Sequence, residues 1–254
     1  MEQPILTVHD LAKHFEQKNG DGFVAVDCVS FSVRAGECVG LVGGSGCGKS
    51  TIAKMLCGLL PPTSGQIVLC GREVAYEKGV RSQSWVQAVQ MVFQNPISSF
   101  DPRRTLGDGI SESLRNLGVP KNEALRRARS LLEQCGLSPD IADRFPREVS
   151  GGQCQRAAIA RALAPDPSLI ICDEATSALD VTVQAQVVQL LARIQQERGL
   201  ALLFVCHDLA LVQGFCDRVL VMQAGRIVEQ GVARTILAHP QHPYTQQLLA
   251  SALN

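Results

Sequence analysis

The sequence lacks an apolar stretch long enough to cross a membrane, a long run of basic residues and any closely spaced pair of cysteines. No segment approaches the roughly 18 consecutive apolar residues that suggest a membrane span. The N-terminus, MEQPILTVHD, has neither a signal pattern nor a lipidation site. These absences predict a soluble chain that works in the cytoplasm.

No charge of one sign dominates, which bears on possible partners. The 254 residues contain 24 Lys plus Arg against 24 Asp plus Glu, and no basic run marks a nucleic-acid-binding tail. We therefore expect no nucleic-acid partner. A chain of 27.3 kDa has room for one sizeable core, or for a core with a smaller subdomain, so we expect a single compact catalytic unit.

The ten cysteines form no CxxC pair, and most of them lie inside apolar runs such as ECVGLVG and LIICDE. This placement is typical of small buried hydrophobic residues in a reducing compartment. It does not indicate a disulfide framework or a metal site.

Strand and helix signals alternate along much of the chain. Short apolar runs predict strands at 37–42, 64–71, 89–94, 169–172 and 200–205. Helical spacing predicts helices at 50–60 and 181–198, and DRVLVMQAGRIVEQG predicts a hairpin that turns at Ala224 and Gly225. The strand–helix–strand order predicts an α/β fold with a parallel sheet covered by helices.

The segment 95–164 interrupts this alternation. SESLRNLG, NEALRRARSLLEQCG and GGQCQRAAIARALA all have helical spacing and almost no β-branched runs. The segment is therefore predicted to be a helical insertion.

The stretch GGSGCGKS at 43–50 fits the pattern G-x-x-x-x-G-K-[ST] and lies between a predicted strand and a predicted helix. Its glycines let consecutive backbone N–H groups converge on phosphate oxygens, and the helix N-terminus adds partial positive charge. We predict that Lys49 reaches the β- and γ-phosphates of ATP and that Ser50 binds Mg²⁺. The predicted phosphate-loop residues are Gly43, Gly44, Ser45, Gly46, Cys47, Gly48, Lys49, Ser50 and Thr51.

Candidate catalytic residues follow two later strands. Asp173 and Glu174 end the run LIICDE, where Asp173 can hold Mg²⁺ through its water shell and Glu174 can accept a proton from an attacking water. His207 follows the next strand, at the sheet edge where open α/β folds bind ligands, and can contact the γ-phosphate or the water. Taken alone, the two acids are typical of a solvated loop and the histidine of a structural residue. The phosphate loop favours the catalytic interpretation.

These motifs, in this order, make the chain resemble the ATP-binding subunits of ABC transporters over nearly its whole length. They are GGSGCGKS, Gln94 in VFQNP, VSGGQ at 149–153, LIICDE, SALD at 177–180, and His207. The resemblance implies a P-loop NTPase fold of the ABC type. Residues 1–94 and 165–254 then form a RecA-like core with an antiparallel β-subdomain, and residues 95–164 form a helical subdomain.

The resemblance also implies that ATP is bound between two chains in a head-to-tail dimer, formed with an identical or a paralogous subunit. An exposed helix N-terminus at VSGGQ needs an anion, which the γ-phosphate on the facing chain supplies. The residues implied there are Ser150, Gly151, Gly152 and Gln153. Among the other implied roles, Gln94 senses Mg²⁺ and the γ-phosphate, Asp180 links the two sites, and Phe15 stacks on adenine. Phe23 is the alternative for stacking, and Phe15 is otherwise a core or strand residue.

The implied partners are two transmembrane permease subunits and an extracytoplasmic substrate-binding protein, which place the chain at the cytoplasmic face of the inner membrane. FQNPISSFDPR, SALDVTVQAQVVQLL and HPYTQQLLAS resemble importers of peptides and nickel. The stop at Asn254 and the segments SGCGKST, QMVFQ and DEA favour nickel slightly. The alternatives are an exporter or release-type ATPase and an ABC ATPase acting on nucleic acid. A single phosphate loop and a short insertion count against the last of these.

Three residues within the motifs stand out, and two of them lead to predictions. Ala175 stands where the family usually has Pro, and Cys206 stands where it usually has Ser or Thr. The missing hydroxyl is predicted to loosen His207 and to lower turnover. Cys47 lies near a helix N-terminus and Lys49, a setting that raises thiol reactivity. We predict that alkylation inactivates the enzyme and that bound ATP protects it.

Overall fold

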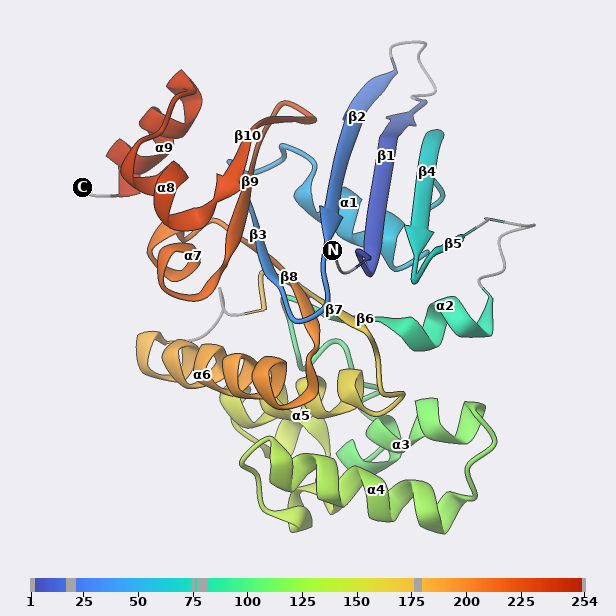
Figure 1. Ribbon diagram of the computed structural model, residues 1–254. Coiled ribbons are helices and arrows are strands. Elements are labelled where there is room, and N and C mark those ends of the chain that lie inside the picture. Colours follow the sequence, from blue (N-terminus) through green and yellow to red (C-terminus); the bar gives the residue numbers. More distant parts are fainter. Residues whose placement is uncertain (1–2, 17–21, 75, 77–81, 176–179, 253–254) are drawn as a thin grey trace.

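A computed structural model of the protein describes residues 3–16, 22–74, 76, 82–175 and 180–252. The described strands form two sheets (Figure 1). The smaller sheet is antiparallel, with the strand order β2-β1-β4-β5. Its strands are β1 (Leu6–Phe15), β2 (Phe23–Val33), β4 (Ser64–Leu69) and β5 (Arg72–Glu73).

The larger sheet has six strands in the order β10-β9-β3-β8-β7-β6. All its neighbouring pairs are parallel except β9 and β10, which form an antiparallel hairpin. Its strands are β3 (Cys38–Val42), β6 (Val89–Val92), β7 (Leu169–Asp173), β8 (Ala201–Cys206), β9 (Arg218–Gln223) and β10 (Arg226–Val232).

The parallel strands are buried on both faces, so their sequences are continuous apolar runs without polar alternation. All five residues of β3 are buried. Val39 and Leu41 pack into one hydrophobic cluster with α1 (Lys49–Leu56) and the antiparallel sheet. Cys38 and Val42 pack into a second cluster, which includes the helices on the other side. The alternation of strand side chains thus separates two cores across one sheet.

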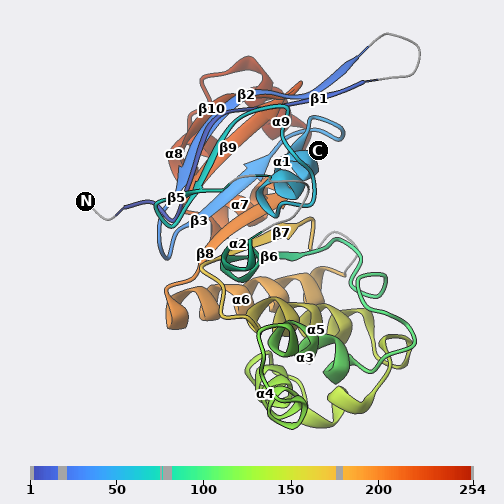
Figure 2. The same cartoon turned by 90° about the vertical axis from the view of Figure 1, so that its right-hand side faces the viewer.

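The helices of residues 106–163 gather at one end of the molecule, away from β1, β2 and β4, in both views (Figures 1 and 2). They are α3 (Leu106–Asn116), α4 (Lys121–Gln134), the 3₁₀ turns η1 (Pro139–Asp143) and η2 (Pro146–Glu148), and α5 (Gly151–Leu163). Helix α6 (Val181–Arg198) lies beside α5 in both views. The other helices of the described residues are α2 (Gln83–Ala88), α7 (Leu209–Phe215), α8 (Ala233–Ala238) and α9 (Pro243–Ala252).

Most of the predicted elements are present. Helix α6 has the predicted bounds, and the β9–β10 hairpin turns at Ala224 and Gly225, both of which have positive φ angles. The helix predicted at 50–60 is shorter, because α1 ends at Leu56 and Gly58 turns the chain away at a φ of 66°. Strands β1 and β2 and helix α2 were not predicted from periodicity.

Eight of the ten cysteines are buried, as expected for small hydrophobic residues, whereas Cys28 and Cys70 are exposed. Among the helices of the described residues, none is both long and apolar enough to cross a membrane.

Candidate functional site

Four parallel strands bring the candidate residues to one edge of the larger sheet. Because β3, β8, β7 and β6 run in the same direction, the residues that follow them meet at their shared carboxyl edge. The loop 43–48 follows β3, Asp173 ends β7, His207 follows β8, and Gln94 follows β6 closely. Strand order therefore explains why residues from four separate motifs lie along one edge of the sheet.

The glycines of the loop have distinct structural roles. Gly48 precedes α1 with a φ of 109°, and a Cβ atom there would lie 2.2 Å from the Ala25 carbonyl oxygen. A Cβ atom on Gly43 would lie 2.2 Å from the Met222 carbonyl oxygen. Gly46 also has a positive φ, but a Cβ atom there would find nothing within 4 Å. The loop is thus fixed at both ends and faces open space at its middle, as an anion cradle must.

Lys49 lies over this loop. Its Nζ donates hydrogen bonds to the carbonyl oxygens of Gly43 at 2.8 Å and Gly44 at 2.9 Å, and only 5% of the residue is exposed. The ammonium group is therefore held beside the cradle by the loop itself. The Sγ atom of Cys47 lies 3.8 Å from Nζ, and Cys47 is buried. This burial opposes the predicted alkylation of Cys47, since a reagent reaches a buried thiol only if the loop moves.

Ser50 and Asp173 contact each other directly. The Ser50 hydroxyl, in the first turn of α1, donates a 2.9 Å hydrogen bond to Oδ1 of Asp173 at the end of β7. Burial raises the pKa of Asp173 above its usual value, with the Glu174 carboxylate adding to this effect and the Ser50 hydrogen bond opposing it. Two oxygen atoms that can ligate a metal ion therefore meet beside the loop. One belongs to a partly desolvated acid, whose charged form a nearby cation would stabilise.

Glu174 and Gln94 form the next pair. The Gln94 amide Nε2 donates to Oε2 of Glu174 at 2.8 Å. Glu174 has a φ of 47°, in the left-handed region that residues other than glycine seldom adopt, and its N–H donates to the Val205 carbonyl at 2.9 Å. This backbone turn directs the chain away from β7 just after Asp173, and the acid contacts Gln94, which directly precedes the segment 95–164.

A cavity of about 540 Å³ opens beside these groups. Phe15 and Phe23, paired across β1 and β2, line it together with the phosphate loop, and they are 38% and 51% exposed. The ammonium of Lys13 lies 5.2 Å from the centre of the Phe15 ring. Phe15 is thus both a strand residue and a cavity residue, and Phe23 accompanies it. The full lining is Phe15, Phe23, Ala25, Ser45, Gly46, Gly48, Lys49, Ser50, Thr51, Gln94 and Glu174.

His207 lies exposed just beyond β8, and the described lining of the cavity does not include it. The preceding residue, Cys206, is buried, and its thiol donates a 3.5 Å hydrogen bond to the Asp208 carbonyl. The predicted loosening of His207 rests on the loss of a hydroxyl at this position. The thiol retains a donor there, although thiol hydrogen bonds are weaker than those of a hydroxyl.

The VSGGQ segment forms the start of α5. Ser150 is the N-cap, its hydroxyl accepts the Gln153 N–H at 3.2 Å, and the Gln153 side chain accepts the Ser150 N–H at 2.9 Å. This capping box leaves Ser150 and Gly151 exposed. Ser150, Gly152 and Gln153 line a separate cavity of about 250 Å³, so the described site of one chain does not combine them with the phosphate loop.

Asp180 begins the neighbouring helix α6, where its carboxylate accepts the Val183 N–H at 3.0 Å as an N-cap. The two helix starts are close, because a Cβ atom on Gly152 would lie 2.7 Å from Cγ1 of Val183. Gly152 thus permits this approach. Ser177 and the other residues of SALD before Asp180 lie outside the described residues.

One contact of the phosphate loop was missed in the sequence analysis. The Gly44 N–H donates a 2.8 Å hydrogen bond to the hydroxyl of Tyr244 in α9. Tyr244 lies in the segment HPYT, which stood out only as a resemblance to peptide and nickel importers. No pattern in the sequence pairs two residues 200 positions apart, so only the folded chain reveals this contact.

A glycine-rich loop between a parallel strand and a helix, with Ser, Asp, Gln and Glu side chains at the same sheet edge, defines the class of P-loop ATPases. The sequence pattern of the ABC transporter family matches residues 26–177. The chain belongs to this family, as its motifs predicted, and has the fold of its ATP-binding cassettes.

Similar proteins include ATP-binding subunits of transporters. A probable peptide ABC transporter ATP-binding protein of Sinorhizobium fredii is 47% identical, over 99% of this chain and 73% of the relative. A putative peptide import ATP-binding protein of Brucella ovis is 46% identical, over 98% and 79%. The oligopeptide transport ATP-binding protein OppF of Escherichia coli is 44% identical, over 97% and 77%.

Solved structures agree with the fold. cbiO1 from Clostridium perfringens, part of the ABC transporter complex cbiONQ, matches with a TM-score of 0.81 and 29% identity, over 94% of this chain and 92% of that one. An ATP-binding cassette solved as a dimer bound to ADP and Pi matches with a TM-score of 0.79 and 26% identity, over 90% and 99%.

Proposed function

We propose that the chain is the ATP-hydrolysing motor of an importer and that the cargo is a short peptide. The observation that carries the cargo is the identity of 44–47% to relatives named for peptide or oligopeptide transport. The prediction of nickel finds no such support among these relatives. The ATPase chemistry is supported by the residues that converge at the edge of the larger sheet.

The donors around Ser50 fit a Mg²⁺ ion accompanying ATP. A serine hydroxyl, the carboxylate of Asp173 and the amide oxygen of Gln94 are the hard oxygen ligands that this ion takes. The contact between Ser50 and Asp173 also gives a buried acid that a cation would stabilise. When bound, the ion would neutralise charge that develops on the phosphates.

In this proposal the other residues act on ATP and water. Backbone N–H groups of the loop and Lys49 bind the phosphates, while Phe15 or Phe23 stacks on the adenine. Glu174 accepts the proton of the attacking water, and Gln94 orients Glu174 by hydrogen bonding. His207 then contacts the γ-phosphate once the site closes.

Closure requires a second cassette. The exposed N-terminus of α5, with Ser150, Gly151, Gly152 and Gln153, would cap the γ-phosphate bound by the facing chain. Asp180, at the adjoining start of α6, would link that contact to the neighbouring site. The helical segment 95–164 acts in this proposal as a subdomain that moves relative to the core.

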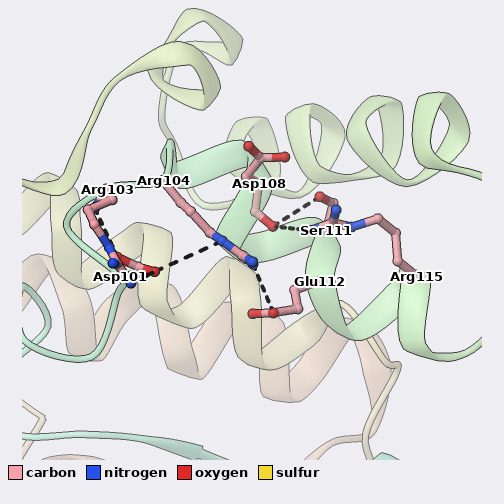
Figure 3. A network of polar contacts seen from close by, with 7 residues as sticks. All are labelled: Asp101, Arg103, Arg104, Asp108, Ser111, Glu112 and Arg115. Atoms are coloured by element: carbon pink, nitrogen blue, oxygen red, sulfur yellow. Dashed lines mark hydrogen bonds and ion pairs between the residues drawn. The ribbon is translucent and has the colours of Figure 1, made fainter.

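The transmembrane permease subunits would dock between the core and the helical segment, which sets the chain at the cytoplasmic face of the membrane. A groove of about 300 Å³ lies there, with Leu59 and Val86 partly exposed along it. A network of charges lies beside it (Figure 3), in which Arg104 pairs with Glu112 at 3.0 Å. An extracytoplasmic binding protein would deliver the cargo to those subunits.

Uptake by cells in which Glu174→Gln replaces the wild-type chain tests the cargo. We expect resistance to a toxic short peptide and unchanged accumulation of nickel. Lost nickel accumulation with unchanged peptide sensitivity would contradict the peptide assignment and favour nickel. If neither changes while the variant is inactive as a purified ATPase, the importer assignment itself is wrong.

A further inference from the structure

Tyr244 provides a polar contact between the C-terminal helix and the phosphate loop. Its hydroxyl oxygen accepts the Gly44 N–H at 2.8 Å, and a Cβ atom added to Gly44 would lie 3.1 Å from the same oxygen. The carbonyl oxygen of Gly44 accepts Nζ of Lys49 at 2.9 Å. Gly44 is therefore held through its N–H by Tyr244 and through its carbonyl by the lysine predicted to bind the phosphates.

Tyr244 is itself held in position by its surroundings. Its ring packs against the core cluster on the helical side of the larger sheet. The turn before it is fixed to β10, because the two carboxylate oxygens of Glu229 accept the N–H groups of Gln241 at 2.9 Å and His242 at 3.1 Å. The Tyr244 N–H donates to Nδ1 of His242 at 3.2 Å. The hydroxyl thus projects from a well-supported turn.

The β9–β10 hairpin adds a second tie to the same loop. The Gly225 N–H donates to the Cys47 carbonyl oxygen at 3.0 Å. Both contacts come from residues C-terminal to His207. One engages the start of the loop and the other its middle, while the backbone around Gly46 remains open toward the cavity. The C-terminal part of the chain therefore constrains the shape of the loop without occupying the space for phosphate.

We propose that Tyr244 is a positioning residue of the nucleotide site, whose hydroxyl holds the loop in its phosphate-binding shape before nucleotide arrives. This inference rests on the proposed role of the loop as the nucleotide site. A loop fixed in advance loses less conformational freedom on binding, so the hydrogen bond favours binding of ATP and ADP. It does not take part in the proton transfer at Glu174, and kcat at saturating ATP depends little on it.

The variant Tyr244→Phe tests this, because it retains the packed ring and removes only the hydroxyl. We expect Kd values for ATP and ADP to rise by the same factor, roughly three- to tenfold, as for the loss of one hydrogen bond. The matched control is Tyr76→Phe, which removes a hydroxyl that donates to the Met55 carbonyl near the other end of α1. We expect this control to lower the unfolding midpoint and to leave both Kd values unchanged.

The inference is wrong if Tyr244→Phe changes the Kd values less than twofold, or if Tyr76→Phe weakens binding equally. Lys49→Ala separates this failure from failure of the proposed function. If Lys49→Ala binds nucleotide normally, the proposed site is wrong and the inference falls with it. If Lys49→Ala loses nucleotide while Tyr244→Phe binds normally, only the role of Tyr244 is wrong.

A double-mutant cycle with Gly44→Ala adds a test of direct contact. Gly44 does not have a positive φ, so alanine fits the backbone, but its Cβ atom would crowd the Tyr244 hydroxyl. We expect Gly44→Ala to weaken ADP binding in the wild-type chain and to add little in the Tyr244→Phe chain. Additive losses would contradict the inference, since they would mean that the two positions act independently.

Discussion

The phosphate loop and the start of α5 are both glycine-containing turns that lead into helices. They differ in how many of their polar groups find partners within the same chain. At the loop, Lys49 is bonded to two carbonyl oxygens and Ser50 to Asp173. At α5, the side chains of Ser150 and Gln153 each accept the backbone N–H of the other residue, and Ser150 and Gly151 are exposed. In the proposed dimer, one chain therefore supplies the phosphate-loop half of one ATP site and presents the start of α5 to the ATP site of the facing chain.

This difference has an energetic reason. A buried lysine or acid must find partners within its own chain, because unpaired buried charge is costly. An exposed helix N-terminus is solvated by water while it waits for an anion, so it folds stably without one. The proposed need for a second copy or a paralogue in catalysis is thus compatible with a cassette that folds alone.

The largest expected effect comes from a substitution at the proposed catalytic acid, beside the phosphate loop. Glu174→Gln should lower ATP hydrolysis by roughly 10²- to 10⁴-fold, because it removes the proton acceptor and preserves shape. ATP binding should persist, and Mg-ATP should trap a dimer that light scattering detects. The control Glu197→Gln alters an exposed acid of α6 that lies 3.9 Å from Arg193 and should hydrolyse ATP normally.

Retained hydrolysis in Glu174→Gln would remove Glu174 from its proposed role. A monomer in Mg-ATP would instead indicate that the partner is a paralogous cassette. Mixing the variant with that paralogue distinguishes the two cases.

A substitution at the exposed start of α5 should have an intermediate effect. Ser150→Ala removes an N-cap, which costs about 1 kcal/mol of stability. Thr105→Ala is its matched control, because Thr105 caps α3 through the same 3.2 Å contact to the residue three positions later. The two variants should unfold at similar denaturant concentrations and bind ATP as monomers alike.

Only Ser150→Ala should weaken the ATP-dependent dimer, by about tenfold if one hydrogen bond to a charged phosphate is lost. The dissociation constant of the dimer is measured in the Glu174→Gln background, where the dimer does not dissociate through ATP hydrolysis. Equal dimerisation of the two cap variants would mean that Ser150 serves only its own helix, and the proposed division of the ATP site would fail.

The sequence predicted the loop side of this comparison well, because local patterns encode it. Apolar runs end at Val42 and Cys172, just before the phosphate loop and Asp173, and parallel strands bring such ends to one edge. The partner-dependent role proposed for VSGGQ rests on the family resemblance, since a capping box alone explains Ser150 locally. The start of α6 just after Asp180 was predictable from the local sequence, because Asp is a favoured N-cap.

The remaining features depend on long-range pairing. Strand β1 pairs with β2 and β4 and has register shifts near Leu11, so its pattern LTVHDLAKHF does not alternate regularly. The helix predicted to reach Leu60 ends early, because backbone geometry at Gly58 overrides the apolar periodicity. Tyr244 reaches Gly44 only because β9 and β10 carry the C-terminal helices back beside β3.

The smallest expected effect concerns the acid that links α1 to β7. Because folding raises the pKa of Asp173, the protonated form is favoured in the folded state. Its contribution to stability is present below the unfolded pKa and is lost as pH rises through the folded pKa. Without nucleotide and Mg²⁺, Asp173→Asn should therefore unfold at a higher temperature than the wild type at neutral pH, and the two should converge in acid.

The control Asp140→Asn changes an exposed acid and should show no such pH-dependent difference from the wild type. Adding ATP with Mg²⁺ should reverse the order at neutral pH, because the wild-type carboxylate then gains a cation and the asparagine does not. An Asp173→Asn protein that is less stable than the wild type without ligand, or that gains equally from Mg-ATP, would show that Asp173 serves the fold. Packing alone would then hold the residues beside the phosphate loop in place, and Asp173 would not contribute to Mg²⁺ binding.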